Sequence, residues 1–374
     1  MKPLIKWPGG KSEEINKIEK YIPSYSRYVE PFFGGGAMFF HLQPEYAAIN
    51  DISKTLMEYY CLIKKQDAEL YELLMCYSNS FSNLIKICNE NYDSIFNIYT
   101  NYISSDLDIG EAQKQLAKLV QYISDEMCSE FADELVLDSS AFIENINSYV
   151  LDKMQRTYKN ELIKPFSAED MKQNLITGFT SGYYMYFRDV YNSIQLNKTI
   201  SPSVQYKVAN FYFIREFCYG SMFRYNSKGE FNIPYGGMSY NRKNLKAKID
   251  NMFCDEVETL FAKTEIVCSD FESFLNGISL SSKDFMFLDP PYDTNFSDYE
   301  GKDFTKFDQE RLAYFLRKTE AQFILIIKNT EFIRQLYEEA HFQILSFDKQ
   351  YTYNIKSRNE RDVEHLIITN LPIQ

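Results

Sequence analysis

The segment Asp289-Pro290-Pro291-Tyr292 combines residues that could bind a planar ring carrying an exocyclic amine. It follows a short apolar run, residues 284–288, which is typical of a buried strand. The two prolines fix successive φ angles, so the Asp289 carboxylate and the neighbouring carbonyls are held in fixed directions. These oxygens could accept the amine hydrogens while the ring stacks on Tyr292. A plain turn after a strand is the alternative, and the four residue types together favour the amine pocket.

A glycine turn near the N-terminus could bind an adenosine-bearing cofactor. Gly34-Gly35-Gly36 follows an expected strand over residues 27–33, and glycines let a ligand approach the backbone closely. A second expected strand ends on Asp51, about 20 residues after Glu30, where an acid can bind ribose hydroxyls. Phe39 stands where a dinucleotide-binding loop has its third glycine. A cofactor without phosphates therefore fits better than NAD.

The remaining periodicity predicts an α/β fold interrupted by a different segment. A helix is expected over residues 53–65, and further strands over residues 265–270, 284–289, 322–327 and 364–369. Residues 66–180 are acidic, helix-leaning and nearly free of glycine and proline. Strand, glycine turn, helix, strand and acid open a doubly wound sheet. The sheet is thus predicted to be split in sequence by the intervening segment.

Composition excludes several classes of protein. The 374 residues are 45% hydrophobic, enough for one large or two modest domains. The sequence contains no run of about 18 apolar residues, so no membrane span is expected. Its N-terminus has no apolar core of a signal peptide, so we expect a cytoplasmic protein. Seven scattered cysteines and three histidines show no metal-ligand spacing, which argues against a zinc site or a histidine triad.

Charge is distributed unevenly along the chain. The net charge of −12 alone argues against a nucleic-acid partner. Residues 61–165, however, hold 9 basic and 17 acidic residues, whereas residues 198–248 hold 9 basic and 2 acidic residues. The basic segment is interleaved with Tyr, Phe, Asn and Gly. This pattern favours contact with a phosphate backbone over a solvated basic face.

Several motifs together resemble the Dam family of adenine-N6 DNA methyltransferases, the α-class or D12 type. Its N-terminal motif is similar to residues 4–11, its glycine loop to residues 28–36, and its ribose-binding acid to residues 50–52. Its DNA-reading hairpin resembles residues 223–236, and its catalytic motif resembles residues 289–292. The order of the motifs matches the α-class, and the resemblance covers roughly residues 1–60 and 180–370.

The resemblance implies a class I Rossmann-like methyltransferase fold with an inserted, mostly helical DNA-recognition domain carrying a β-hairpin. Residues 1–60 and 262–374 would form the catalytic domain, residues 61–180 an acidic helical insertion, and residues 181–261 the target-recognition region. The implied cofactor is S-adenosyl-L-methionine, without a metal. Catalysis would fall to Asp289, Pro290, Pro291 and Tyr292, and cofactor binding to Trp7, Lys11, Glu30, Phe32, Gly34, Asp51, Asp270, Phe271 and Asp289.

The implied partner is double-stranded DNA, from which the target adenine must be flipped. Tyr225 is a candidate wedge, and Asn226, Ser227 and Lys228 could reach base edges. Arg224, Arg242 and Lys243 would hold phosphates, together with Lys246 and Lys248. The family suggests GATC as a first recognition sequence. A monomer is favoured, and whether a restriction endonuclease partner exists stays open.

Four other readings remain. Cytosine-N4 methylation uses the same amine chemistry, although Asp before the two prolines leans toward adenine. Methylation of structured RNA is disfavoured by the hairpin resemblance. A non-catalytic DNA-binding subunit would not need the intact Trp7, Lys11, Asp51 and Asp289 set. The dehydrogenase interpretation is weakened by Phe39, which stands where a dinucleotide-binding loop has its third glycine, and by the Asp289-Pro290-Pro291-Tyr292 motif.

Overall fold

The structure is a computed structural model that describes residues 1–11, 14–104, 108–196, 201–291, 304–338, 342–350 and 362–372. The chain divides into two compact units. One combines residues 1–65 with residues 255–374 and is called the sheet unit. The other, residues 66–254, is called the helical unit.

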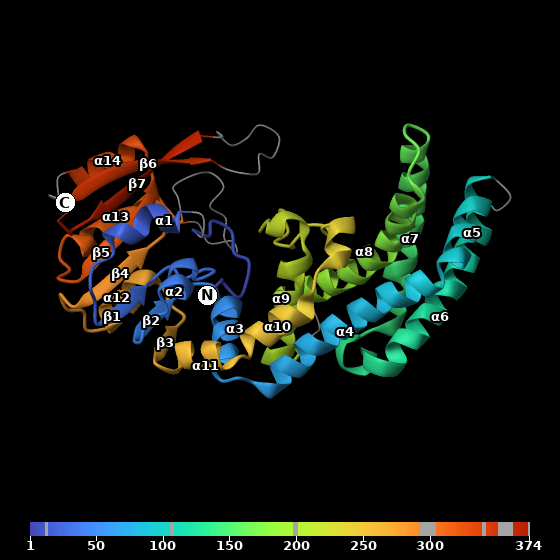
Figure 1. Cartoon of the computed structure of the whole chain (residues 1–374), viewed down its shortest axis with the longest axis horizontal. Helices are drawn as coiled ribbons and strands as arrows, with labels where there is room; N and C mark the ends of the chain where they lie inside the picture. The colour runs from blue at the N-terminus through green and yellow to red at the C-terminus, as the bar shows by residue number, and fades with distance from the viewer. Residues whose placement is uncertain are drawn as a thin grey trace. The chain divides into compact units, whose positions relative to one another are not determined.

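The sheet unit is built on a seven-stranded sheet with the order β3-β2-β1-β4-β5-β7-β6 (Figure 1). Neighbouring strands from β3 to β5 are parallel, whereas β7 runs antiparallel to both β5 and β6. The chain order therefore reverses between β1 and β4, and ligands of such sheets bind beyond the carboxyl ends of the strands at that point. The strands are β1 (Arg27–Glu30), β2 (Ala47–Asn50), β3 (Thr264–Val267), β4 (Asp284–Leu288), β5 (Gln322–Lys328), β6 (Gln343–Gln350) and β7 (Asp362–Thr369).

Helices cover both faces of the sheet, which explains the continuous apolar runs of its central strands. On one face, buried side chains of β1, β4, β5 and β7 share a core with α12 (Phe271–Gly277), α13 (Lys306–Leu316) and α14 (Glu331–Glu338). The opposite face carries Tyr28, whose ring lies 6.3 Å from that of Phe39 on α2 (Ala37–Leu42). Phe39 in turn packs on α11 (Asp255–Ala262), which contacts α3 (Lys54–Lys64). A short helix, α1 (Ile15–Ile18), precedes β1.

The sequence predictions for the sheet unit are largely confirmed. The fold is mixed α/β with a mostly parallel sheet, and each of the six predicted strands overlaps an observed one. Strand β6 was not predicted. It forms an edge of the sheet, and none of its described side chains is fully buried, so it lacks a continuous apolar run. The antiparallel direction of β7 was not foreseen either.

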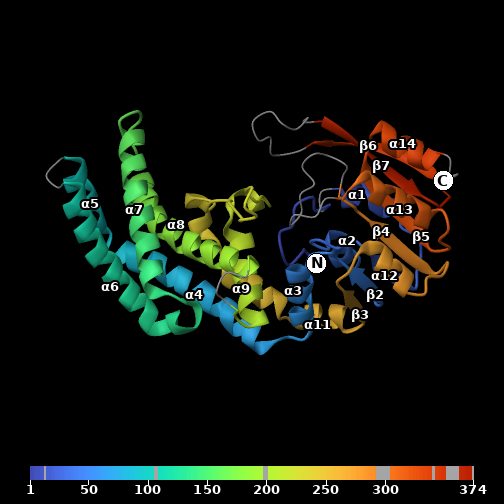
Figure 2. The same ribbon diagram turned by 180° about the vertical axis from the view of Figure 1, so that it is seen from behind.

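The helical unit contains long helices with an aromatic core. Helix α7 (Ser139–Glu161) and helix α8 (Ala168–Gln195) run alongside each other (Figures 1 and 2). They can approach closely because Gly182 has no side chain, and an added Cβ there would lie only 2.5 Å from Ile146 Cα. Tyr77 stacks on Phe213 with ring centroids 4.7 Å apart. No helix among the described residues is long and apolar enough to cross a membrane. The helices are α4 (Ala68–Glu90), α5 (Tyr92–Ile103), α6 (Ile109–Leu135), α7 (Ser139–Glu161), α8 (Ala168–Gln195), α9 (Val204–Phe217) and α10 (Leu245–Met252).

Helix starts in this unit follow local sequence signals. Asp67, Asp138, Ser167 and Ser203 each accept a hydrogen bond from a backbone N–H in the first turn of α4, α7, α8 and α9. Residues 66–180 are thus mostly helical. The division into an insertion over residues 61–180 and a recognition region over residues 181–261 stays a prediction.

Candidate functional site

The glycine turn follows β1 and is packed against the N-terminal segment. Gly34 has φ +49° and Gly36 has φ +65°, a backbone region that favours glycine. An added Cβ at Gly34 would lie 2.7 Å from Trp7 Cδ1, and one at Gly35 would lie 3.1 Å from Trp7 Cβ. The turn therefore needs glycine both for its backbone conformation and for the indole. Trp7 and Gly34, both predicted cofactor contacts, are adjacent.

Asp51 lies directly after β2 and is held by the backbone. One carboxylate oxygen accepts a hydrogen bond from the Gly34 N–H at 2.8 Å, and the other accepts one from the Ser53 N–H at 2.9 Å. Burial raises the pKa of this carboxyl, and these backbone bonds oppose the shift. Each oxygen retains a second lone pair, so the fixed carboxylate could still accept hydrogen bonds from a diol.

Asn50 ties the carboxyl ends of three strands together, a role that the sequence did not reveal. Its side-chain amide donates to the carbonyls of Pro31 and Ser269 at 3.0 and 3.1 Å, and its oxygen accepts the Ser269 N–H at 2.9 Å. The segments after β1, β2 and β3 are thereby held in register. Only the Asn50-Asp51-Ile52 motif marked this residue in the sequence.

The proline corner begins where β4 ends. Lys11 Nζ lies 2.5 Å from both carboxylate oxygens of Asp289 and donates to the Gly9 carbonyl at 3.0 Å. Lys11 is only 2% exposed, and a buried ammonium requires such partners. Because Trp7 packs on the glycine turn while Lys11 pairs with Asp289, the segment 7–11 connects both predicted motifs. Tyr292, the fourth predicted catalytic residue, lies outside the described residues.

Glu30 is a buried acid between these motifs. It is 2% exposed and accepts a hydrogen bond from the Tyr28 hydroxyl at 2.8 Å. Burial raises the pKa of Glu30 well above its ordinary value, the Tyr28 bond opposes the rise, and the nearby charges of Asp289 and Asp51 add to it. Asp51 and Asp289 are thus both close enough to Glu30 to raise its pKa.

Asp270 and Phe271 start α12, beside the same edge of the sheet. Asp270 accepts hydrogen bonds from backbone N–H groups of the first turn and pairs with Arg311 at 2.5 Å. The Phe271 ring lies 5.3 Å from that of Phe32 and 5.7 Å from that of Phe304. Phe32 and Phe271, both predicted cofactor contacts, therefore share an aromatic cluster. Arg311 was not predicted, because its partners Asp270 and Glu272 are distant from it in the sequence.

The predicted DNA contacts belong to the helical unit. A turn there is closed by an isolated antiparallel bridge between Tyr225 and Phe231. Inside it, the Asn226 side-chain oxygen accepts the backbone N–H groups of Lys228 and Glu230. The exposed residues of the predicted set are Arg224, Ser227, Lys228, Arg242 and Lys246.

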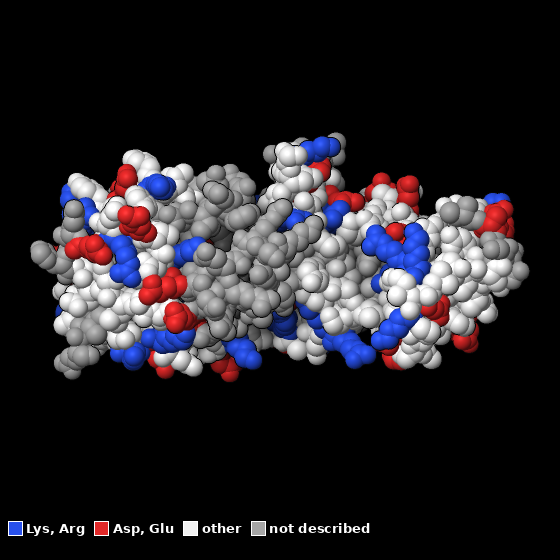
Figure 3. Space-filling view, turned by 90° about the horizontal axis from the view of Figure 1, so that it is seen from above, with Lys and Arg blue, Asp and Glu red and all other residues white. Residues whose placement is uncertain are grey.

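Some predicted contacts are engaged within the unit. Tyr225 is half-buried, with its hydroxyl 3.1 Å from that of Tyr191. Lys243 donates to the Glu216 carbonyl and lies 3.5 Å from the Tyr240 ring centroid, and Lys248 pairs with the Glu216 carboxylate. Figure 3 shows basic and acidic side chains interspersed on the face that it displays.

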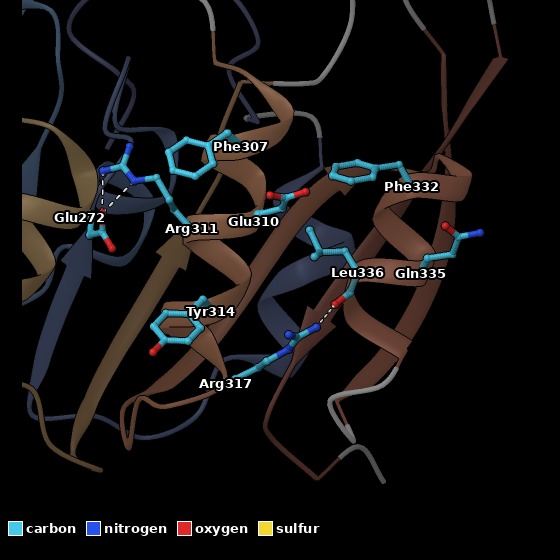
Figure 4. Close-up of a pocket in the computed structure, with 9 residues that line it drawn as sticks. All are labelled: Glu272, Phe307, Glu310, Arg311, Tyr314, Arg317, Phe332, Gln335 and Leu336. Atoms are coloured by element: carbon cyan, nitrogen blue, oxygen red, sulfur yellow. Dashed lines mark hydrogen bonds and ion pairs between the residues drawn. The ribbon is translucent and has the colours of Figure 1, made fainter.

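A separate depression of about 630 Å³ lies on the outer surface of the sheet unit, between α13 and α14 (Figure 4). Its lining is part aromatic and part charged. Among its residues only Arg311 and Glu272 connect to the residues discussed above, through the ion pairs of Arg311. The lining residues are Glu272, Phe307, Glu310, Arg311, Tyr314, Arg317, Phe332, Gln335 and Leu336.

A mostly parallel seven-stranded sheet with a glycine turn after β1 and an acid-proline-proline corner after β4 is consistent with a methyltransferase fold. The model of the D12 class N6 adenine-specific DNA methyltransferase family matches residues 7–105 and 122–353. The chain belongs to this family and is an adenine-specific DNA methyltransferase.

Full-length relatives agree with this assignment. The chain is 25% identical over 374 residues to the Type II methyltransferase M.CviBI of Paramecium bursaria Chlorella virus NC1A. The alignment covers 99% of this chain and 100% of the relative. It is 26% identical over 390 residues to the Type II methyltransferase M.MjaIII of Methanocaldococcus jannaschii, with 99% of both chains covered. A DNA adenine methylase of Vibrio cholerae is 20% identical, with 96% of this chain and 93% of the relative covered.

Proposed function

We propose that this protein transfers a methyl group from S-adenosyl-L-methionine to N6 of an adenine flipped out of duplex DNA. The observation that carries the proposal is the double contact of the N-terminal segment. Trp7 packs on Gly34 while Lys11 binds Asp289. A cofactor at the glycine turn and an amine at the proline corner would therefore meet within one site of the sheet unit.

The residues at the glycine turn fit S-adenosyl-L-methionine. The Asp51 carboxylate is fixed by the Gly34 and Ser53 N–H groups and has lone pairs left for ribose hydroxyls. Because Gly34 has no side chain, the turn packs directly on Trp7 and can present its backbone to a ligand. Phe32 and Phe271 offer apolar rings for a purine. When bound, this cofactor supplies a methyl group already activated by a sulfonium.

The proline corner fits the amine of adenine. The N6 lone pair is delocalised into the ring, so the enzyme must favour a more pyramidal nitrogen. Asp289 and the Pro290 carbonyl would each accept one N–H of the amine, and Tyr292 would stack on the ring. The anionic carboxylate would also stabilise positive charge developing on N6. Lys11 orients that carboxylate through both of its oxygens, and direct transfer then depends mainly on positioning.

The turn around Tyr225 is the proposed DNA-reading element. Flipping a base costs a few kcal/mol, which contacts elsewhere must offset. The exposed Ser227 and Lys228, with the neighbouring Asn226, would read base edges in the major groove. Arg224, Arg242 and Lys243 would contact phosphates.

The test is methylation of unmethylated plasmid DNA by the full chain with isotope-labelled S-adenosyl-L-methionine. Digestion to nucleosides, mass spectrometry and sequencing of modified positions give the base, its atom and its context together. N6-methyladenine in one short sequence context is the expected product. N4-methylcytosine, or label found only in a parallel structured RNA, would replace the proposed substrate. Cofactor binding without any methyl transfer would overturn the proposal.

A further inference from the structure

Gln309 on α13 is a buried amide that touches the proline corner. Its side chain is 0% exposed, and its Nε2 donates a hydrogen bond to the Pro291 carbonyl at 3.1 Å. Burying a polar amide in an apolar core is unfavourable unless it satisfies a partner. The Pro291 carbonyl is such a partner for Nε2, whereas Oε1 has no hydrogen-bond partner among the described residues. Two consecutive prolines contribute no N–H with which the corner could order its own carbonyls.

This hydrogen bond fixes one peptide plane next to the proposed amine acceptors. The Pro291 carbonyl belongs to the peptide unit that joins Pro291 to Tyr292. With this carbonyl held by Gln309, the peptide cannot rotate freely, and both proline φ angles are already fixed. Among the described residues no hydrogen bond to the Pro290 carbonyl, one residue earlier, is observed, so this oxygen could accept one from a target amine.

The donor itself is firmly anchored. Thr305 and Asp308 form a capping box at the start of α13, in which each side chain accepts a hydrogen bond from the backbone N–H of the other residue. The first turn of the helix, just before Gln309, is therefore fixed. Arg311, half a turn further on, binds Asp308 at 2.8 Å and also Asp270 and Glu272. Gln309 therefore projects from a helix start that is tied to α12.

We propose that Gln309 is a positioning residue for methyl transfer: by holding the Pro291 carbonyl, it directs the Asp289 carboxylate and the Pro290 carbonyl together toward the target amine. The inference rests on the proposed function. It predicts a defect in the transfer step and not in binding, since the hydrogen bond from Gln309 reaches the corner at its second proline.

The test compares Gln309→Met and Gln309→Glu with the neighbouring Glu310→Gln. The Met variant keeps the volume and removes the donor. The Glu variant keeps the shape and can donate only when its carboxyl is protonated. Glu310 is exposed on the same helix and serves as the control. Single-turnover methyl transfer at saturating cofactor and duplex DNA is measured across pH, with equilibrium dissociation constants for both ligands and thermal unfolding.

For Gln309→Met we expect the transfer rate to fall roughly ten- to a hundredfold, with both dissociation constants unchanged. For Gln309→Glu, the rate relative to the unmodified enzyme at the same pH should rise as pH falls. Glu310→Gln should match the unmodified enzyme. A wild-type rate for Gln309→Met overturns the inference, as does a flat pH ratio for Gln309→Glu or a parallel loss of cofactor binding. An inactive unmodified enzyme would instead refute the proposed function itself.

Discussion

The three acidic side chains of the site differ in how their charge is held. Asp289 is paired with the buried ammonium of Lys11, and Asp51 accepts two backbone N–H groups. Glu30 has a neutral partner, the Tyr28 hydroxyl, and is almost fully buried. A carboxylate with a cation or several N–H donors is stabilised in its charged form, whereas one in a low-dielectric site is not. The same residue type should therefore respond differently to substitution at the three positions.

Replacing Asp289 removes both the amine acceptor and the stabilising anion. Asp289→Asn keeps the shape and one acceptor but loses the charge, and Asp289→Ala loses both. We expect single-turnover methyl transfer to fall roughly 10²- to 10³-fold in the Asn variant and further in the Ala variant. Binding of S-adenosyl-L-methionine, measured by calorimetry, should persist in part because Asp51 and Gly34 are intact. Substantial transfer by Asp289→Ala would remove this carboxylate from the chemistry.

The raised pKa of the buried Glu30 carboxyl should make the folding stability depend on pH. Its pKa in the folded protein is raised above the ordinary value of 4.5, so between these values the folded chain binds more protons than the unfolded chain. The contribution of Glu30 to stability is therefore fully present below pH 4.5 and is lost as pH rises through the raised value. Glu30→Gln mimics the neutral acid and should be more stable than the unmodified protein at pH 8.

Urea unfolding at several pH values measures this effect. The free energy of unfolding of Glu30→Gln should exceed that of the unmodified protein at pH 8. The gain should vanish toward pH 4.5. Glu320→Gln changes an exposed carboxyl of the same unit and is the control. A Glu30→Gln variant that is equally stable, or less stable, at pH 8 would contradict the burial argument.

At the scale of elements, the sequence was most informative where local patterns suffice. Apolar runs located β4 and β5 because both faces of these strands are buried. Edge strand β6 has no such pattern, and the direction of β7 depends on pairing partners that the local sequence does not specify. The same distinction applies to the site. Motifs marked Trp7, Gly34, Asp51 and Asp289, whereas Gln309 and Arg311 act through partners brought together only by the fold.

A substitution in the glycine turn should displace the whole turn and not only one contact. Gly34→Ala places a Cβ where φ is +49° and where Trp7 Cδ1 would lie 2.7 Å away. The turn must then shift, and Trp7 with it, so the affinity for S-adenosyl-L-methionine should fall at least tenfold by calorimetry. Gly277→Ala is the matched control, since a Cβ there meets nothing within 4 Å. Equal cofactor affinity in the two variants would show that the turn does not form part of the cofactor site.

At the scale of the whole molecule, the chain must bind a polyanion despite a net charge of −12. Long-range attraction cannot come from the net charge, so it must come from local clusters within a Debye length of the phosphates. The basic residues of 198–248 are the candidates, and some are already engaged within the helical unit. Lys248 pairs with Glu216, and Lys246 pairs with Asp250. The exposed arginines of the set, Arg224 and Arg242, should therefore contribute most to phosphate contact.

The salt dependence of DNA binding tests this assignment. If Arg224 and Arg242 each neutralise one phosphate, the double variant Arg224→Gln/Arg242→Gln releases fewer counterions on binding. The slope of log affinity against log salt should then become shallower by about 2, with affinity reduced for specific and non-specific duplexes alike. Lys86→Gln/Lys114→Gln removes the same charge from exposed side chains of α4 and α6 and should leave the slope unchanged. Equal shifts in both double variants would mean that net charge governs binding, and that the basic segment is a solvated surface.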